Sequence, residues 1–291
     1  MTENPNPQES YPYPDRDTTP PGEGSPSPAG SGQAYDRQQP PPFDSAPSPT
    51  ARPIRAAYTP PARTPFVTYT IMGITIVTFL AQWGTQTFLG VDLPAIYGMK
   101  VNDLIAQGQL WRLFTPMLLH GGILHIAFNM YALRVLGPGL EHHYGHVRFL
   151  LLYLLAGFAG NVGSLALSAA PSLGASTSLF GLFGAEGVFL YHNRELFGER
   201  ARVALNRVLT LAAINLFIGL SPGIDNWGHI GGLVGGSLFA WFAGPLLRLE
   251  GIAPAYSIKD HRELASVWVA AIGVGVLFAV IAAGVIFLRT G

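Results

Sequence analysis

Two polar residues, Ser176 and His229, each stand at the start of a strongly apolar, glycine-rich stretch of this sequence. Ser176 follows Gly174-Ala175, and His229 follows Gly228. A hydroxyl or an imidazole in such a place costs free energy unless it is hydrogen-bonded or put to use. A serine with a histidine in reach is the minimum arrangement for a nucleophile and its general base. The pair therefore predicts nucleophilic catalysis, provided that both stretches enter a membrane from the same side.

Each of these residues also has a structural interpretation. A serine at the start of a helix is often an N-cap that satisfies free backbone N–H groups. A histidine in an apolar helix can bond a neighbouring helix. Asp225 lies four residues before His229 and invites a catalytic triad, but a carboxylate after Pro222 and Gly223 also suits a helix cap. We expect a Ser176–His229 dyad, with Asp225 as a cap.

A third group of polar residues precedes another apolar stretch. His125 and Asn129 are four residues apart and share one face of a helix, where both can donate hydrogen bonds to an anionic oxygen. His120 precedes this helix and is expected to be an anchor. Together with His229 the two histidines could supply three metal ligands, but no carboxylate or H-E-x-x-H pattern accompanies them, so we expect no metal and no cofactor. No pair of aspartates lies inside apolar stretches, which disfavours aspartyl protease chemistry.

The elements that carry these residues have the composition of membrane spans. Of 291 residues, 49% are apolar and only 12% are charged, against about 25% charged in soluble domains. Apolar runs near the length of about 20 residues that crosses a bilayer recur along the chain, and backbone in lipid must be helical. We predict spans at 66–88, 122–141, 148–169, 176–192, 204–221, 227–247 and 266–288. The predicted fold is an all-α polytopic membrane protein.

Positive charge sets the orientation of these spans. With the N-terminus in the cytoplasm, twelve Lys and Arg residues near the spans fall inside, and only Lys100, Arg112 and Arg289 fall outside. The spans that begin near His125, Ser176 and His229 then all run inward from the outer face. The active-site opening and the C-terminus are therefore expected outside, and the plasma membrane is the expected location. A transporter or proton channel is disfavoured, because its polar groups would continue through the membrane.

Two further segments carry expectations. Residues 90–118 are too polar to span and too apolar for a simple loop, so we expect an amphipathic hairpin in the outer interface, with Trp111 and Arg112 at headgroup depth. Glu141, at the inner end of its span, is expected to have a structural role there.

The N-terminal segment has a different composition from the rest. Residues 1–64 hold 16 of the 24 prolines, and such a segment buries too little apolar surface to fold. We expect a disordered cytoplasmic tail, which is either a spacer or a ligand for an unidentified partner domain, and a membrane domain over residues 65–291. A net charge of zero disfavours nucleic acid as a partner.

Taken together, these residues resemble the rhomboid intramembrane serine proteases. The resemblance rests on Trp111-Arg112, on His120, His125 and Asn129, on Gly174-Ala175-Ser176 and on Gly228-His229-Ile230-Gly231-Gly232, in the family's order. It implies a six-helix core around a water-filled cavity, here followed by one more transmembrane helix. It also implies Ser176 as nucleophile, His229 as general base, and the Ser176 backbone N–H, His125 and Asn129 as oxyanion donors. The substrates would be transmembrane segments of membrane proteins, met within the lipid.

One residue departs from the family's G-x-S-G pattern, because Thr177 follows Ser176. Threonine adds a β-branched side chain where glycine permits close backbone approach. Two functions therefore stay open at this point: an active endopeptidase, and a catalytically impaired relative that binds transmembrane helices.

Overall fold

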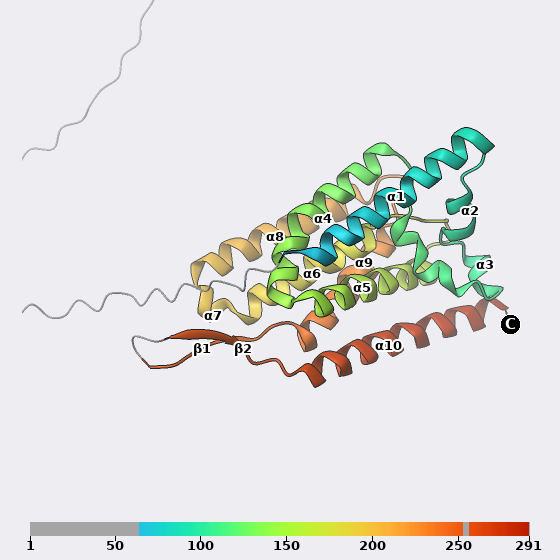
Figure 1. The fold of residues 1–291 in the computed structure, drawn as a ribbon. Helices are drawn as coiled ribbons and strands as arrows, with labels where there is room; N and C mark the ends of the chain where they lie inside the picture. The colour runs from blue at the N-terminus through green and yellow to red at the C-terminus, as the bar shows by residue number, and fades with distance from the viewer. Residues whose placement is uncertain (1–63, 253–255, 291) are drawn as a thin grey trace, which may run out of the picture. The chain divides into compact units, whose positions relative to one another are not determined.

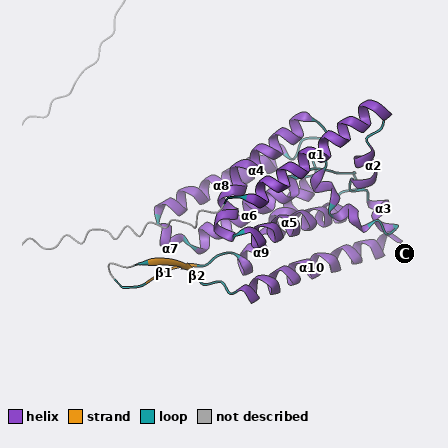
Figure 2. Ribbon diagram, in the orientation of Figure 1, coloured by secondary structure: helices purple, strands orange, loops and turns teal. Residues whose placement is uncertain are grey.

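The computed structural model describes residues 64–252 and 256–290, and this part of the chain is almost entirely helical (Figures 1 and 2). The expected disordered tail falls on residues 1–63 and thus lies outside the described residues, apart from Thr64. In chain order the elements are α1 (Phe66–Leu89), α2 (Leu93–Gly98), α3 (Asn102–Ala106), η1 (Leu110–Leu113), η2 (Thr115–Leu118), α4 (Ile123–Tyr144), α5 (His146–Leu167), α6 (Ser176–His192), α7 (Arg194–Phe197), α8 (Glu199–Ile218), α9 (Asn226–Ala243), β1 (Leu247–Glu250), β2 (Ser257–Asp260) and α10 (Leu264–Thr290).

A long helix occupies the place of every span that the sequence predicts. Five of them, α1, α4, α5, α8 and α10, are long and apolar enough to cross a membrane by length and composition. The other two, α6 with 17 residues and α9 with 18, are shorter and carry Ser176 and His229. The all-α polytopic membrane fold is confirmed, while the count of seven spans stays a prediction.

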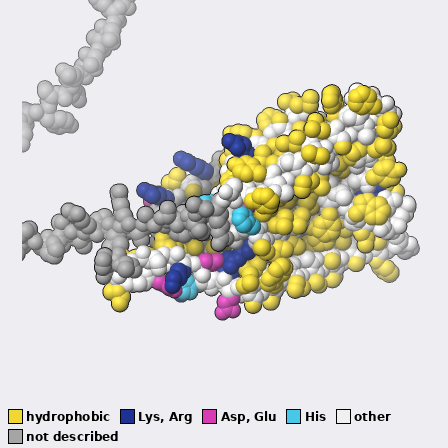
Figure 3. Space-filling model, viewed as in Figure 1, with side chains coloured by type: hydrophobic (Ala, Val, Ile, Leu, Met, Phe, Trp, Pro, Cys, Tyr) yellow, Lys and Arg dark blue, Asp and Glu magenta, His cyan; other side chains and the backbone are white. Residues whose placement is uncertain are grey.

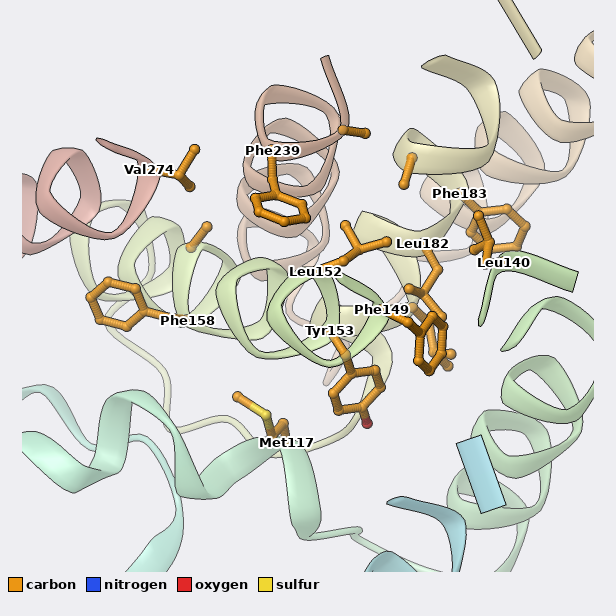
Figure 4. Packing of buried hydrophobic residues seen from close by; sticks show 14 of the residues in the cluster. Met117, Leu140, Phe149, Leu152, Tyr153, Phe158, Leu182, Phe183, Phe239 and Val274 are labelled. Carbon is orange, nitrogen blue, oxygen red and sulfur yellow. The ribbon is translucent and has the colours of Figure 1, made fainter. Parts of the chain in front are cut away.

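The centre of the bundle is formed by α5, α6 and α9, which pack closely through small residues. A Cβ added at Gly236 of α9 would lie 2.4 Å from Gly181 Cα on α6, so these two backbones are in direct contact. Around this contact lies an apolar core, in which Phe149, Leu152 and Tyr153 of α5 are almost fully buried (Figure 4). This arrangement holds the N-terminal halves of α6 and α9 side by side.

The segment between α1 and α4 is more elaborate than the hairpin expected from the sequence. It forms four short helices, α2, α3, η1 and η2, at the end of the bundle where α4 and α6 begin (Figure 1). Trp111 is half-exposed and donates from Nε1 to the carbonyl of Tyr97. Arg112, however, is turned inward and is 2% exposed, with Nη1 and Nη2 donating to the carbonyls of Met99 and Ile96. It satisfies the end of α2 instead of facing headgroups, because a guanidinium can cap several carbonyls at once.

A two-stranded antiparallel hairpin, which the sequence did not predict, lies at the opposite end of the bundle. β1 and β2 pair from Leu247 with Asp260 to Glu250 with Ser257. The hairpin is tied to the helices by Asn193, whose amide accepts from the N–H of Leu247 and donates to the carbonyl of Pro245. Charged side chains gather at this end, whereas the helices present a mostly apolar surface (Figure 3). We call this the hairpin end, and the end with Ser176 the serine end.

Glu141 has a structural role at the hairpin end, as expected. Its buried carboxylate accepts hydrogen bonds from the backbone N–H groups of Val67 and Thr68 and from Thr68 Oγ1. It is also paired with His146. A carboxylate placed on free N–H groups stabilises a helix N-terminus, so Glu141 of α4 holds the start of α1.

Candidate active site

Ser176 and His229 meet at the serine end, on neighbouring helices. Oγ of Ser176 lies 2.9 Å from Nε2 of His229, which is hydrogen-bond distance. Ser176 is the first residue of α6, and the N-cap position is taken by Ala175, which makes no side-chain cap. The hydroxyl is therefore directed at the imidazole, and the N-cap interpretation of Ser176 is wrong. The first backbone N–H groups of an α-helix have no acceptor within the helix, and those of α6 begin at Ser176.

His229 is held by packing rather than by a second hydrogen bond. Its ring stacks on Phe180, with centroids 4.3 Å apart and an interplanar angle of 16°. Among the described residues Nδ1 of His229 has no hydrogen-bond partner. Asp225 instead accepts from the N–H of Gly228 and caps α9. The structure thus places Ser176 and His229 in hydrogen-bond contact, with Asp225 as a helix cap beside them.

His120 anchors the segment that leads into Ser176. Its backbone N–H and carbonyl both bond the side-chain amide of Gln82 on α1, and Nε2 accepts from the N–H of Ala175 at 3.4 Å. Burial, with a smaller contribution from His125, lowers the pKa of His120 to about 3. His120 is therefore neutral and can accept that hydrogen bond. His120 thus connects α1 to the segment that leads into Ser176.

The remaining oxyanion candidates line the same cavity as the dyad. His125 lies against Gly174, because a Cβ there would lie 2.8 Å from His125 Nε2 and 3.6 Å from Ser176 Oγ. Gly174 has a φ of 138°, so both its conformation and its neighbours require glycine. Asn129 donates one N–H to the carbonyl of His125, which leaves its second N–H available.

A cavity of about 940 Å³ joins these groups. Its wall includes the four polar residues His125, Asn129, Ser176 and His229. Two loop segments also line it: Ser168 with Ala170–Leu173, and Gly223–Asp225. It continues between α4 and α8, where Val135 and Leu211 line it. The two loop segments lie at the serine end, so the cavity combines a polar head beside the dyad with an apolar groove along the helices.

Thr177 points away from this cavity. Thr177 is 5% exposed and packs against two glycines. A Cβ added at Gly160 would lie 2.5 Å from Cβ of Thr177, and a Cβ added at Gly228 would lie 3.1 Å from Cγ2 of Thr177. The extra atoms that distinguish Thr177 from glycine are thus accommodated in the α5–α9 interface. They do not enter the space beside Ser176 Oγ.

Three residues of the site were missed by the sequence reasoning. Phe180 comes four residues after Ser176, so helical periodicity could have placed it on the same face of the helix as Ser176. Gln82 is a polar residue inside an apolar span, which is itself a signal. Lys100 gave no signal beyond its charge: it is fully buried, and its Nζ donates to the carbonyls of Ser168 and Ala170. It fixes the segment that leads from α5 to Ser176.

Comparison with known proteins finds similar sequences in one family. Residues 107–246 match the family model of the rhomboid domain. Rhomboid protease GluP of Bacillus subtilis (strain 168) is 39% identical over 215 residues, which are 74% of this chain and 40% of that protein. RHOMBOID-like protein 9, chloroplastic, of Arabidopsis thaliana is 36% identical over 160 residues, 55% of this chain and 37% of that protein. RHOMBOID-like protein 6, mitochondrial, of the same plant is 42% identical over 153 residues, 51% of this chain and 50% of that protein.

This chain thus spans half or less of the length of these three relatives. The matched region nevertheless contains both residues of the dyad, His125, Asn129 and Arg112. The sequence motifs, the all-helical membrane fold and the family match agree: the chain belongs to the rhomboid family.

Proposed function

We propose that this protein is an intramembrane serine endopeptidase that cleaves transmembrane or juxtamembrane segments of membrane proteins. The observation that carries the proposal is the 2.9 Å contact between Ser176 Oγ and His229 Nε2 at the wall of a large cavity. The name of the Bacillus relative, a rhomboid protease, supports it. So does Thr177, whose side chain leaves the nucleophile unobstructed.

In the first step Ser176 Oγ attacks the carbonyl carbon of the scissile peptide bond, and His229 Nε2 takes the hydroxyl proton. The carbonyl oxygen becomes an oxyanion. The free N–H groups at the start of α6, the second N–H of Asn129 and the ring of His125 are the donors placed around it. Removal of one such donor typically lowers kcat about 10²- to 10³-fold.

The intermediate then breaks its C–N bond, and the leaving amine takes the proton from His229. Water next attacks the acyl ester with His229 as the base, which releases the carboxylic acid and restores Ser176. This second half needs water beside Ser176. The polar lining residues Ser168, Ser172 and Asp225 suit water, while the groove between α4 and α8 suits an apolar substrate segment.

We further propose that the serine end faces outward across the plasma membrane, with the N-terminus in the cytoplasm. The support is the excess of Lys and Arg that the positive-inside rule would place in the cytoplasm. To check this, one cysteine would be introduced at each end of the bundle, and whole cells would be treated with a membrane-impermeant maleimide. Labelling of the hairpin end alone would overturn it.

The activity is tested with purified protein in liposomes and a transmembrane reporter. Ser176→Ala is expected to abolish cleavage and labelling by a fluorophosphonate, and His229→Ala is expected to abolish both while leaving the helical circular dichroism unchanged. Ser178→Ala is the matched control, because that hydroxyl is buried beside Met117. Full cleavage by the Ser176 variant would contradict the proposal, and so would the absence of both cleavage and labelling in the parent protein. The alternative function would then be a protein that binds transmembrane helices without cleaving them.

A further inference from the structure

A second cavity, of about 550 Å³, lies between α9 and α10 and shares no lining residue with the cavity that holds the α4–α8 groove. Leu238 and Phe242 form its α9 wall. Its α10 wall runs from Ala265 to Leu277 and is apolar except for Ser266, and Arg262 closes the hairpin end. The volume falls within the range of about 300 to 1,000 Å³ that is typical of ligand sites.

The cavity exists because α10 presents small residues toward α9. Ala270 and Gly273 lie on the groove face, and a Cβ added at Gly273 would meet no atom within 4 Å. Small residues usually let two membrane helices close up. Here the helices do not close at this level, and the groove stays open along them.

The length of the groove corresponds to one leaflet. From Leu264, where α10 begins just after Arg262, to Leu277 the helix rises by about 20 Å at 1.5 Å per residue. Half of a bilayer, headgroups included, measures about 20 to 22 Å. An amphiphile with its head at Arg262 would therefore lay its acyl chain along Gly273 and Leu277.

The charge at the head of the groove is positive and lacks a carboxylate of its own. Arg262 donates from Nε to the carbonyl of Gly244 and from Nη2 to that of Trp241, which leaves three of its five N–H groups without a partner among the described residues. The neighbouring carboxylate of Asp260 is engaged by Arg148 and by the backbone N–H groups of Leu246 and Arg262. No ion pair of the Arg262 guanidinium occurs in the part of the chain that the structure describes.

We propose that this α9–α10 groove is a binding site for one acidic phospholipid, whose phosphate is held by Arg262 and whose acyl chain fills the space beside Gly273. A guanidinium binds phosphate through parallel charge-assisted hydrogen bonds. The site is separate from the dyad and holds whether or not Ser176 is catalytic.

The test is native mass spectrometry of the delipidated full chain with added phosphatidylglycerol or phosphatidylcholine at equal concentration. The parent protein should retain one phosphatidylglycerol at least about tenfold more strongly than phosphatidylcholine, as expected for a charge-assisted contact. Gly273→Leu places a side chain in the groove from a Cβ position that has no atom within 4 Å, and should lower this retention about tenfold. Gly284→Leu is the matched control, because Gly284 also has no atom within 4 Å of an added Cβ but lies beyond the groove.

Arg262 is tested with two variants, since it also holds two carbonyls. Arg262→Gln should remove the preference for phosphatidylglycerol, and Arg262→Lys, which keeps the charge, should restore most of it. Inorganic phosphate alone should fail to displace the lipid, because the acyl chain contributes to binding. Equal retention of both lipids, unchanged retention in Gly273→Leu, or displacement by phosphate would each overturn the proposal.

Discussion

Replacement of Gly232 by alanine should separate the two halves of the dyad. A Cβ at Gly232 of α9 would lie 2.0 Å from the carbonyl oxygen of Thr177 on α6, the residue after Ser176, and ordinary contact begins at 3.4 Å. The backbones must therefore move apart by up to 1.4 Å, the difference of these two distances. The Ser176–His229 bond of 2.9 Å leaves only about 0.3 Å before it exceeds normal hydrogen-bond length.

A displacement of this size has a large expected effect on rate. Misplacement of reacting groups by about 1 Å can cost about 10²-fold, so kcat for a transmembrane reporter in liposomes should fall about 10²-fold in Gly232→Ala. The rate of fluorophosphonate labelling should fall with it, and overpacking should lower stability by about 1 to 3 kcal/mol. Both rates and the thermal unfolding midpoint in detergent would be measured at a temperature where the variant is folded.

The matched control is Gly84→Ala on α1, where an added Cβ meets nothing within 4 Å. This change should leave kcat unaltered and should not lower the unfolding midpoint, since alanine is the better helix former. Wild-type rates in Gly232→Ala would refute the reasoning that the α6–α9 contact sets the dyad distance. Equal losses in both variants would show a general intolerance of alanine instead.

Three other changes probe the parts that support the dyad. Phe180→Leu removes the ring stacked on His229, worth about 1 kcal/mol, and should lower kcat about fivefold with KM unchanged; a changed KM alone would contradict this role. Glu141→Gln leaves backbone donors at the start of α1 poorly matched and should lower the unfolding midpoint by the equivalent of about 1 to 3 kcal/mol, whereas Glu195→Gln, on the short helix α7, should not. Burial lowers the pKa of Lys100 from 10.5 to about 8. Between pH 8 and pH 10.5 the unfolded chain therefore binds more protons than the folded one, and the free energy of unfolding should rise with pH. In Lys100→Met this rise should disappear, and a rise that persists in the variant would have to come from other groups.

The long helices could be predicted from the sequence because lipid imposes their length and their internal hydrogen bonding. The predicted span 176–192 coincides with α6. α8, by contrast, begins at Glu199, five residues before the predicted start at 204, because its first turn is charged and an apolar window cannot detect it. A helix that extends beyond the apolar layer ends by hydrogen bonding and capping rather than by hydropathy.

The contacts between distant segments could not be predicted in the same way. Nothing local in the sequence indicates that Glu141 binds the start of α1, 73 residues away at Thr68, or that Arg112 turns inward to the carbonyls of α2. The β1–β2 hairpin was missed because its strands have only four residues each and follow a long apolar helix. Such features depend on which segments the helices bring together, and that arrangement is a property of the packed bundle.

The residue that separated the two candidate functions, Thr177, is explained by the same packing that forms the dyad. α6 and α9 approach so closely because Gly232 and Gly236 leave no side chain between them. This contact fixes the distance from Ser176 to His229, and it also directs the side chain of Thr177 toward Gly160 and Gly228, away from the cavity. A threonine is thus compatible with the Ser176–His229 contact because the neighbouring helices supply glycines to receive it. In a Gly160→Ala background, Thr177→Gly should therefore raise the free energy of unfolding, because it removes the side chain that the new Cβ would meet. A double-mutant cycle in which the effects of the two changes are additive would show that residues 160 and 177 do not share this space.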